Sequence, residues 1–172
     1  FSNGKKSMSL LVVKDLSLEL NKNSIIDNIN FELENNQILS ILGPSGSGKS
    51  SILRLLAGLV MPNKGSISLI NKKISTKNLL VPTGERNIGL MFQEDVLFPH
   101  LTVFKNIAFG VGKMHHKDQE DLVNSFIDKF GLTDKKNNFP NSLSGGEKQR
   151  VSLARVLITN PKILLMDEPF SN

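Results

Sequence analysis

The residues best suited to chemistry lie in a glycine-rich segment, GPSGSGKS, at positions 43–50. An apolar run, ILSIL at 38–42, precedes it, and a helical pattern follows from Ser51 to about Gly58. Glycines let a backbone curl until successive N–H groups converge on phosphate oxygens. The helix that follows directs its positive end at the same anion. A strand, loop and helix in this order predict a phosphate-binding P-loop rather than a simple glycine- and serine-rich turn.

Two side chains of this segment have predicted roles with a nucleotide. Lys49 would reach the β- and γ-phosphates, and the Ser50 hydroxyl would complete the coordination shell of Mg²⁺. We therefore predict a site for a nucleotide and Mg²⁺. Its predicted nucleotide-binding residues are Gly43, Pro44, Ser45, Gly46, Ser47, Gly48, Lys49, Ser50 and Ser51.

A pair of carboxylates follows a second apolar run. Asp167 and Glu168 come directly after ILLM at 163–166, where the carboxyl end of a buried strand would present them to a ligand. We predict that Asp167 holds Mg²⁺ through water and that Glu168 is the catalytic residue that polarises the attacking water. Gln93 ends another apolar run and could supply a neutral oxygen to the metal, although a solvated glutamine would look the same. The predicted metal ligands are Ser50, Gln93 and Asp167.

Short apolar runs along the chain predict the elements that position these residues. We expect antiparallel strands at 10–13, 17–20, 25–26 and 29–33, and further strands at 66–70 and 88–92. Residues 38–42 are expected to form a strand buried on both faces, and residues 71–86 a loop. Helical patterns cover 102–139, with a break at 110–112, and 145–159. Strands that alternate with helices predict an α/β fold.

Composition narrows the class of protein. The 172 residues include no cysteine, which excludes disulfide scaffolds, zinc ribbons and thiol nucleophiles. The net charge of +5 is spread over lysines, with no clustered, aromatic-rich basic stripe, so a solvated surface is predicted and no nucleic-acid partner. No apolar stretch approaches the ~20 residues that span a bilayer. We expect a cytoplasmic protein in which residues 1–8 are a leader or an expression remnant.

The segment LSGGEKQ at 143–149 is the most discriminating. It resembles the signature motif of ATP-binding-cassette (ABC) ATPases, and the resemblance extends over residues 10–172. It identifies residues 43–50 as Walker A, Gln93 as the Q-loop glutamine and residues 163–168 as Walker B. The resemblance implies a P-loop NTPase fold over residues 9–172, with a RecA-like, mostly parallel sheet. An N-terminal antiparallel β subdomain and a helical subdomain at about 101–158 would complete it.

The resemblance also implies a dimer. Two subunits would pair head to tail, so that each signature motif closes over the ATP on its partner's P-loop. The signature residues with this implied role are Ser144, Gly145, Gly146, Glu147 and Gln149. A helix N-cap followed by flexible glycines is the simpler structural alternative.

Within the family, ERNIGLMFQ at 85–93 and VLFPHLTV at 96–103 resemble importer subunits, with a slight leaning towards the iron(III) group. The resemblance implies ATP hydrolysis at the cytoplasmic face of the inner membrane, a membrane permease and, indirectly, a solute-binding protein. A coupling helix of the permease would dock on Val96, Leu97 and Phe98, which we expect to be exposed. A local hydrophobic cluster is the alternative.

Two departures from the family pattern leave alternatives open. The position that usually stacks an aromatic side chain on adenine falls near Leu20, so weaker base discrimination is predicted. The printed chain stops before the D-loop aspartate, the switch histidine and the strand that leads to that histidine, so we expect a gap in the sheet. A nucleotide-binding dimerisation module without turnover therefore remains an alternative. A soluble ABC ATPase is another, although the sequence contains neither a coiled-coil insertion nor a second cassette.

Overall fold

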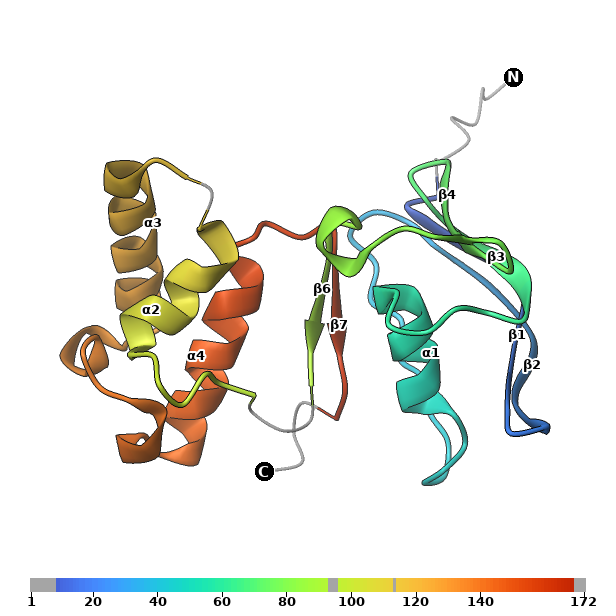
Figure 1. Ribbon diagram of the computed structural model, residues 1–172, viewed down its shortest axis with the longest axis horizontal. Helices are drawn as coiled ribbons and strands as arrows, with labels where there is room; N and C mark the ends of the chain where they lie inside the picture. The colour runs from blue at the N-terminus through green and yellow to red at the C-terminus, as the bar shows by residue number, and fades with distance from the viewer. Residues whose placement is uncertain (1–8, 93–95, 113, 169–172) are drawn as a thin grey trace, which may run out of the picture. The chain divides into compact units, whose positions relative to one another are not determined.

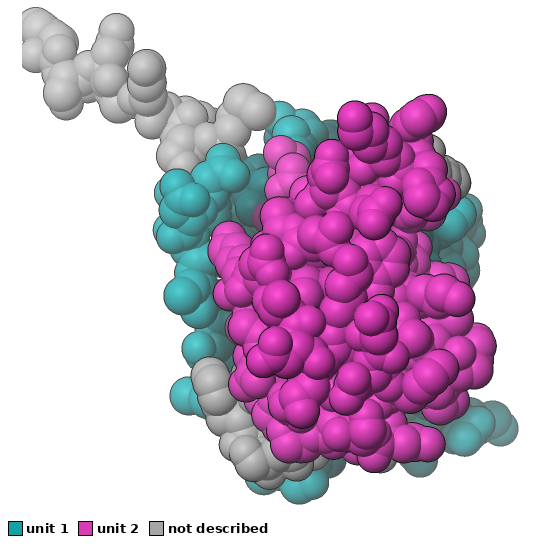
Figure 2. Space-filling model, turned by 90° about the vertical axis from the view of Figure 1, so that its left-hand side faces the viewer, with its two compact units in different colours: residues 1–86 teal, residues 87–172 magenta. Residues whose placement is uncertain are grey.

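The computed structural model describes residues 9–92, 96–112 and 114–168. The chain forms two compact units, residues 1–86 and 87–172, shown in teal and magenta in Figure 2. Unit 1 contains the P-loop segment, and unit 2 contains the acidic pair and the signature segment. Each unit is described by itself.

Unit 1 contains a five-stranded antiparallel sheet (Figure 1). Its strand order is β2-β1-β3-β4-β5, so the first strand of the chain lies inside the sheet. The apolar side chains of β1, β3 and β4 form much of the core of this unit. The strands are β1 (Leu11–Leu20), β2 (Asn23–Leu33), β3 (Lys64–Leu69), β4 (Lys72–Thr76) and β5 (Leu79–Leu80).

The sequence predicts four short strands near the N-terminus, and the structure has two long strands, β1 and β2, in their place. β1 and β2 pair with Leu20 opposite Asn23, and the two turn residues between them, Asn21 and Lys22, have φ angles of 51° and 66°. Positive φ at both positions is the geometry of a tight hairpin turn. The register shifts at several points along β1, and these bulges produced the gaps in the sequence pattern. The antiparallel prediction is confirmed.

The prediction of a loop at residues 71–86 is wrong for its first half, where residues 72–76 form a strand. Ile70 and Asn71 form a tight turn with φ angles of 47° and 62°, and the chain returns as β4 beside β3. The charged side chains of β4 at Lys72 and Lys73 are exposed, whereas Ile74 is buried. A short strand with one buried apolar residue gives too weak an alternation to be seen in the sequence. A 3₁₀ turn, η1 (Thr83–Glu85), follows β5.

Helix α1 (Lys49–Ala57) begins at the P-loop, as predicted. Its buried residues are Ile52, Leu55, Leu56 and Ala57, and the first three recur at helical spacing. It ends at Gly58, whose φ of 80° is the left-handed conformation in which glycine commonly terminates a helix.

The strand predicted at 38–42 is wrong. The described chain has no strand there, and Ile38 and Leu42 are 95% and 90% exposed. A strand obtains its backbone hydrogen bonds from a neighbouring strand, and within the described residues no segment pairs with this one. An apolar run therefore leads into the P-loop without becoming part of a sheet.

Over its described residues, unit 2 contains a two-stranded parallel sheet and three α-helices (Figure 1). The sheet joins β6 (Ile88–Met91) to β7 (Ile163–Met166), where two strands were expected. The mostly parallel sheet that the resemblance implies is not found in the described chain: parallel pairing there is limited to these two strands, and the larger of the two sheets is antiparallel. The helical elements are α2 (Val103–Ala108), η2 (Phe109–Val111), α3 (His116–Lys129), η3 (Thr133–Lys135), η4 (Pro140–Ser142) and α4 (Gly145–Leu157).

The three α-helices of unit 2 enclose a core of their own. Val103, Ile107, Val123, Ile127 and Val151 from these helices are all buried to 1% exposure or less. Such a core holds the N-terminal end of α4, and with it the signature segment, on a packed support. Among the helices of the described segments, none has the length and apolar character needed to cross a membrane.

Candidate nucleotide-binding site

Glycine conformation shapes the loop at residues 43–50. Gly46 and Gly48 have φ angles of 79° and 89°, which side chains other than glycine rarely adopt. The amide of Ser47 donates to the carbonyl oxygen of Pro44 at 3.3 Å and closes a turn. Residues 43–47 are exposed. The loop is therefore a compact, accessible turn of the kind that the sequence predicts.

The N-cap and first turn of α1 supply no negative group of their own. Its N-cap is Gly48, which has no side chain to accept a hydrogen bond from the first turn, and the first turn contains no acidic residue. The partial positive charge of a helix N-terminus is concentrated on the N–H groups of that first turn. This end of the helix is thus suited to an anion.

Lys49 lies over the loop in this structure. Its Nζ donates to the carbonyl oxygens of Gly43 at 3.0 Å and Pro44 at 2.9 Å. These bonds hold the ammonium group beside the loop, where its charge adds to that of the helix end. Both partners are neutral carbonyl groups, so a phosphate would offer the ammonium a stronger, charge-assisted bond.

Strand β2 supports the end of the loop. A Cβ at Gly48 would lie 3.0 Å from the carbonyl oxygen of Ile25 and 3.5 Å from the side chain of Ile26. Close backbone approach, in addition to positive φ, therefore requires glycine at this position. Leu20, at the end of β1, is 49% exposed. Its contact with adenine remains a prediction.

The acidic pair follows β7 as the sequence predicts. Met166 is the register partner of Met91, and the amide of Asp167 donates to the carbonyl oxygen of Met91 at 3.1 Å, so this pairing extends past the strand. Asp167 is half-buried, whereas Glu168 is exposed and has a φ of 46°. The two carboxylates therefore lie at the carboxyl end of a parallel pair of strands, where α/β sheets bind ligands.

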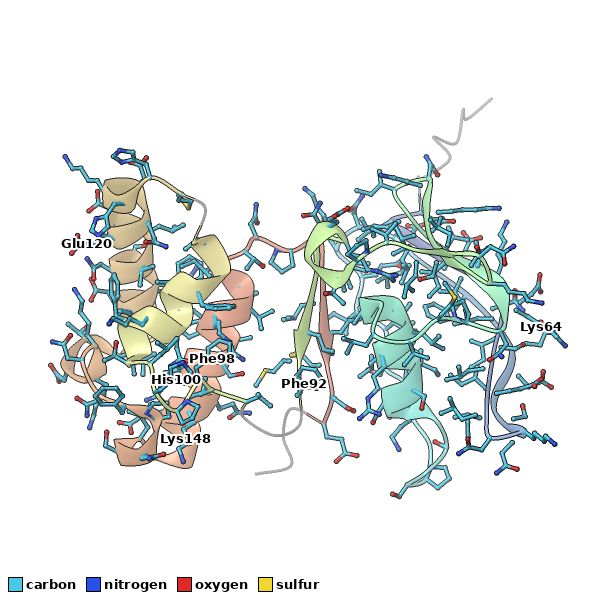
Figure 3. The ribbon with its side chains drawn as sticks, in the orientation of Figure 1. Lys64, Phe92, Phe98, His100, Glu120 and Lys148 are labelled. Carbon is cyan, nitrogen blue, oxygen red and sulfur yellow. The ribbon has the colours of Figure 1, made fainter. Side chains whose placement is uncertain are left out.

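The three residues predicted to hold Mg²⁺ come from separate parts of the chain. Ser50 belongs to unit 1 and Asp167 to unit 2, and Gln93 lies outside the described residues. Gln93 follows Phe92, the first residue after β6 (Figure 3). The joint coordination of Mg²⁺ by these three residues remains a prediction.

Ser144 and Glu147 form a complete capping box at the start of α4. The Glu147 amide donates to Ser144 Oγ at 3.3 Å, and the Ser144 amide donates to Glu147 Oε2 at 2.7 Å. The hydrogen bond from the Ser144 backbone is the main cause that lowers the pKa of Glu147, and Lys135, 3.5 Å away, adds to it. The alternative interpretation of this segment as a helix N-cap is thus correct for Ser144. The N-cap role is compatible with the implied contact of Ser144 with a partner's ATP, because a hydroxyl that accepts one hydrogen bond still has a proton to donate.

The two signature glycines have no packing role in the described chain. A Cβ at Gly145 would meet no described atom within 4 Å, and one at Gly146 would meet only the end of the Arg150 side chain, at 3.8 Å. Both glycines are exposed and helical. Glycine in a helix is about 1 kcal/mol less favourable than alanine. Gln149 lies one turn further along α4, half-buried.

The expectation that Val96, Leu97 and Phe98 are all exposed is wrong for two of them. Val96 is 51% exposed, whereas Leu97 and Phe98 are half-buried, and Leu97 packs against the helical core. The Phe98 ring lies 4.6 Å from that of Phe109, and the two labelled rings of Phe98 and His100 lie side by side in Figure 3. The local cluster therefore accounts for most of this segment.

Two buried polar residues were not assigned a role from the sequence. Asn106 accepts from the Phe98 amide at 2.9 Å and donates to the carbonyl oxygens of Phe98, Leu101 and Thr102, so it holds the loop before α2. Its place on one helical face with Val103 and Ile107 was an available signal. Arg86 is the second such residue, and a lone arginine before a strand gives no comparable signal.

A family model described as ABC transporter matches residues 26–171 of this chain. The chain belongs to the ABC transporter family. The match includes the P-loop, the acidic pair and the signature segment, so the three motifs occur together as they do in that family.

Several of the curated relatives of this chain are named import ATP-binding proteins. The Fe(3+) ions import ATP-binding protein FbpC of Haemophilus influenzae is 43% identical over 164 residues, which are 94% of this chain and 47% of the relative. A probable sulfate/thiosulfate import ATP-binding protein CysA of Chlorella vulgaris is 42% identical, over 95% of this chain and 68% of the relative. The chain spans about half the length of several of the curated relatives that it matches.

A solved structure has the same fold. CbiO1 from Clostridium perfringens, part of the ABC transporter complex CbiONQ, superimposes with a TM-score of 0.82 at 28% identity. The similarity covers 95% of this chain and 67% of CbiO1. This agreement supports the ABC-family α/β architecture with its antiparallel sheet.

Proposed function

We propose that this chain is the ATP-binding and ATP-hydrolysing subunit of an ABC importer. The observation that carries the proposal is the N-terminal end of α1, where a glycine N-cap, a first turn without acids and the Lys49 ammonium concentrate positive charge on an exposed loop. A polyphosphate is the ligand that this arrangement suits. The relatives are named import ATP-binding proteins, which supports ATP as the ligand and import as the process.

Residues 43–51 would bind the phosphates of ATP, with Ser50, Gln93 and Asp167 as ligands of Mg²⁺. All three side chains offer oxygen atoms, the ligand type that Mg²⁺ prefers, so the donor set fits this ion. The ion would neutralise charge on the phosphates. Glu168, exposed at the end of β7, would orient and polarise the attacking water. Most of the catalysis would come from positioning and charge stabilisation.

The signature residues would act on ATP bound by a second copy of the chain. Gly145 and Gly146 occupy helical positions where no packing in the described chain requires a glycine. A bare, exposed helix end that is already capped by Ser144 and Glu147 can admit a phosphate to close contact with its backbone. This supports a head-to-tail homodimer in which Ser144, Gly145, Gly146, Glu147 and Gln149 face the partner's nucleotide.

A membrane permease would be the other partner, with a solute-binding protein acting through it. Val96, two residues before Phe98, has an exposed apolar side chain, and Phe109, whose ring packs on that of Phe98, is 64% exposed. Exposed apolar side chains of this kind suit a docking helix. The chain would then lie peripherally at the cytoplasmic face of the membrane. Dimer closure on ATP and reopening after hydrolysis would drive solute uptake.

The test measures Mg-ATP binding by calorimetry and phosphate release on the same preparations. Lys49→Ala should weaken binding by about a hundredfold, because it removes the cation that would face the phosphates. Glu168→Gln should keep the affinity within about threefold and reduce release by at least about a hundredfold. Glu85→Gln removes another exposed carboxylate and serves as the matched control.

Each other outcome has a distinct meaning. The chain could bind Mg-ATP and yet show no phosphate release that Glu168→Gln abolishes. That result would contradict the proposed ATP hydrolysis and favour a nucleotide-binding module without turnover. Absence of binding by the unmodified chain would contradict the proposed nucleotide site itself.

A further inference from the structure

Arg86 is the one charged residue among the buried side chains that the structure describes. It is 1% exposed and is the last residue of unit 1. Removing a guanidinium from water is unfavourable unless polar groups replace the lost hydration. The groups around Arg86 therefore indicate what this burial achieves.

Four backbone carbonyl groups, from three separate segments of unit 1, accept hydrogen bonds from Arg86. Nε donates to Val81 at 2.6 Å, and Nη2 donates to Ile74 at 3.1 Å, on β4. Nη1 donates to Leu55 at 3.4 Å and to Leu56 at 3.1 Å, both in the last turn of α1. The planar guanidinium thus joins the end of α1 to β4 and to the segment that follows β5.

Backbone carbonyl dipoles compensate the positive charge of Arg86. Within the described segments, no carboxylate lies at ion-pair distance from it, and burial lowers its pKa from the usual arginine value. The carbonyl groups of the last turn of a helix carry the negative end of the helix dipole. An arginine in this place stabilises the C-terminal end of α1: it supplies a donor to the Leu56 carbonyl of the last turn and a second donor to the Leu55 carbonyl, which also accepts from the Gly58 amide at 3.1 Å.

Gly58 leaves the space that the guanidinium occupies. A Cβ at this position would collide with Cζ, Nε and Nη2 of Arg86. Gly58 also has a φ of 80°, so backbone conformation and side-chain packing require glycine together. The helix terminus and the arginine therefore fit each other as a pair.

We propose that Arg86 is a positioning residue of the nucleotide site, which fixes the direction of α1 and thereby the place of Lys49 and the P-loop. The helix has nine residues, a rigid rod of about 13 Å, with Arg86 at one end and Lys49 at the other. Because the rod is rigid, a shift of its C-terminal end moves its N-terminal end as well. Errors of about 1 Å at a phosphate site weaken binding and catalysis. This inference rests on the proposed binding of ATP by residues 43–51.

The experiment compares Mg-ATP affinity with thermal stability in three variants of the purified protein. Arg86→Met keeps the aliphatic bulk and removes every hydrogen bond of the guanidinium. Arg86→Lys keeps the charge and part of the bonding. Val13→Ala shortens a side chain of β1 that is 1% exposed and belongs to the same unit, so it supplies a similar loss of stability without a bond to α1. Affinities are measured well below the lowest thermal midpoint, so that every variant is folded.

We expect the dissociation constant for Mg-ATP to rise about tenfold in Arg86→Met and by a smaller factor in Arg86→Lys, while Val13→Ala stays within about twofold. Hydrogen exchange in residues 52–56 of α1 should accelerate in Arg86→Met and not in Val13→Ala. If Arg86→Met does not fold, the comparison of Arg86→Lys with Val13→Ala decides by the same criterion.

An Arg86 variant that loses stability but keeps its affinity would overturn the proposal and leave Arg86 a purely structural residue. Failure of the unmodified protein to bind Mg-ATP would be a different result, since it would overturn the proposed function, and with it the role of Arg86 in that site.

Discussion

The two helices that begin at glycine-rich segments, α1 and α4, start in opposite ways. α1 has Gly48 as its N-cap, no side-chain cap and no acid in its first turn. α4 has Ser144 as its N-cap and a Glu147 side chain that returns the hydrogen bond. The N-terminus of α1 therefore has neither a side-chain cap nor an acid from its own first turn, whereas that of α4 is capped by its own residues.

This difference separates two ways of presenting a backbone to phosphate. At α1 the loop and the helix end attract an anion by charge, and Lys49 reinforces it. At α4 the capping box already stabilises the helix end without a ligand. The exposed glycines Gly145 and Gly146 can therefore let a phosphate come close to the backbone, although they do not supply the main attraction for it. The first arrangement suits binding by one chain, and the second suits a contact made later by a partner.

Placing an acid at the start of α1 should have the largest effect, because it makes α1 resemble α4. Ser51 is the third residue of α1, and Glu147 occupies the corresponding position in α4. Ser51→Glu should weaken Mg-ATP binding about a hundredfold through repulsion of the phosphates, as measured by calorimetry. Ser51→Gln is the control of equal size. Equal losses in both variants would show that bulk, and not charge, governs the loop.

Adding a methyl group at the signature should have the next largest effect. Gly145→Ala should reduce phosphate release about tenfold, because the new Cβ occupies the space through which the partner's nucleotide would approach. The thermal midpoint should stay the same or rise, since alanine favours a helix and meets no described atom. Gly112→Ala is the control, at another exposed glycine of unit 2. Unchanged release in Gly145→Ala would argue against close approach at this glycine.

Removing the cap of α4 should have the smallest effect and act on stability. Ser144→Ala loses the hydroxyl that accepts from the Glu147 amide and should destabilise the fold by about 1 kcal/mol. The thermal midpoint should fall by roughly 2–4 °C in calorimetry, and Ser144→Thr, which keeps the hydroxyl, should restore it. A midpoint unaffected by alanine would mean that the capping box contributes nothing measurable.

Much of the candidate site was predictable because its signals are local. The start of α1 at a glycine, the end of α1 at Gly58 and the acids after β7 all follow from residues adjacent in the sequence. The capping box of α4 is likewise a pattern of four consecutive residues. Each depends on backbone conformations and hydrogen bonds between near neighbours, which residue types reveal directly.

The errors have a common cause in longer-range contacts. Residues 38–42 have the composition of a buried strand, but within the described chain they lack the neighbouring strand that would bury them. Residues 72–76 have the composition of a loop, but β3 and β5 flank them and make them a strand. In both cases the outcome depends on which segments are adjacent in space, and apolar periodicity does not contain that information.

The amino-acid sequence by itself determined the family of this chain, the order of its motifs and the residue types that could hold phosphate and a metal ion. Only the tertiary structure showed that Arg86 is buried against the end of α1, that Asn106 holds the loop before α2, and that Phe98 is mostly enclosed. The physical reason is that motif chemistry depends on adjacent residues. The burial of a polar group, in contrast, depends on partners brought together from distant parts of the chain.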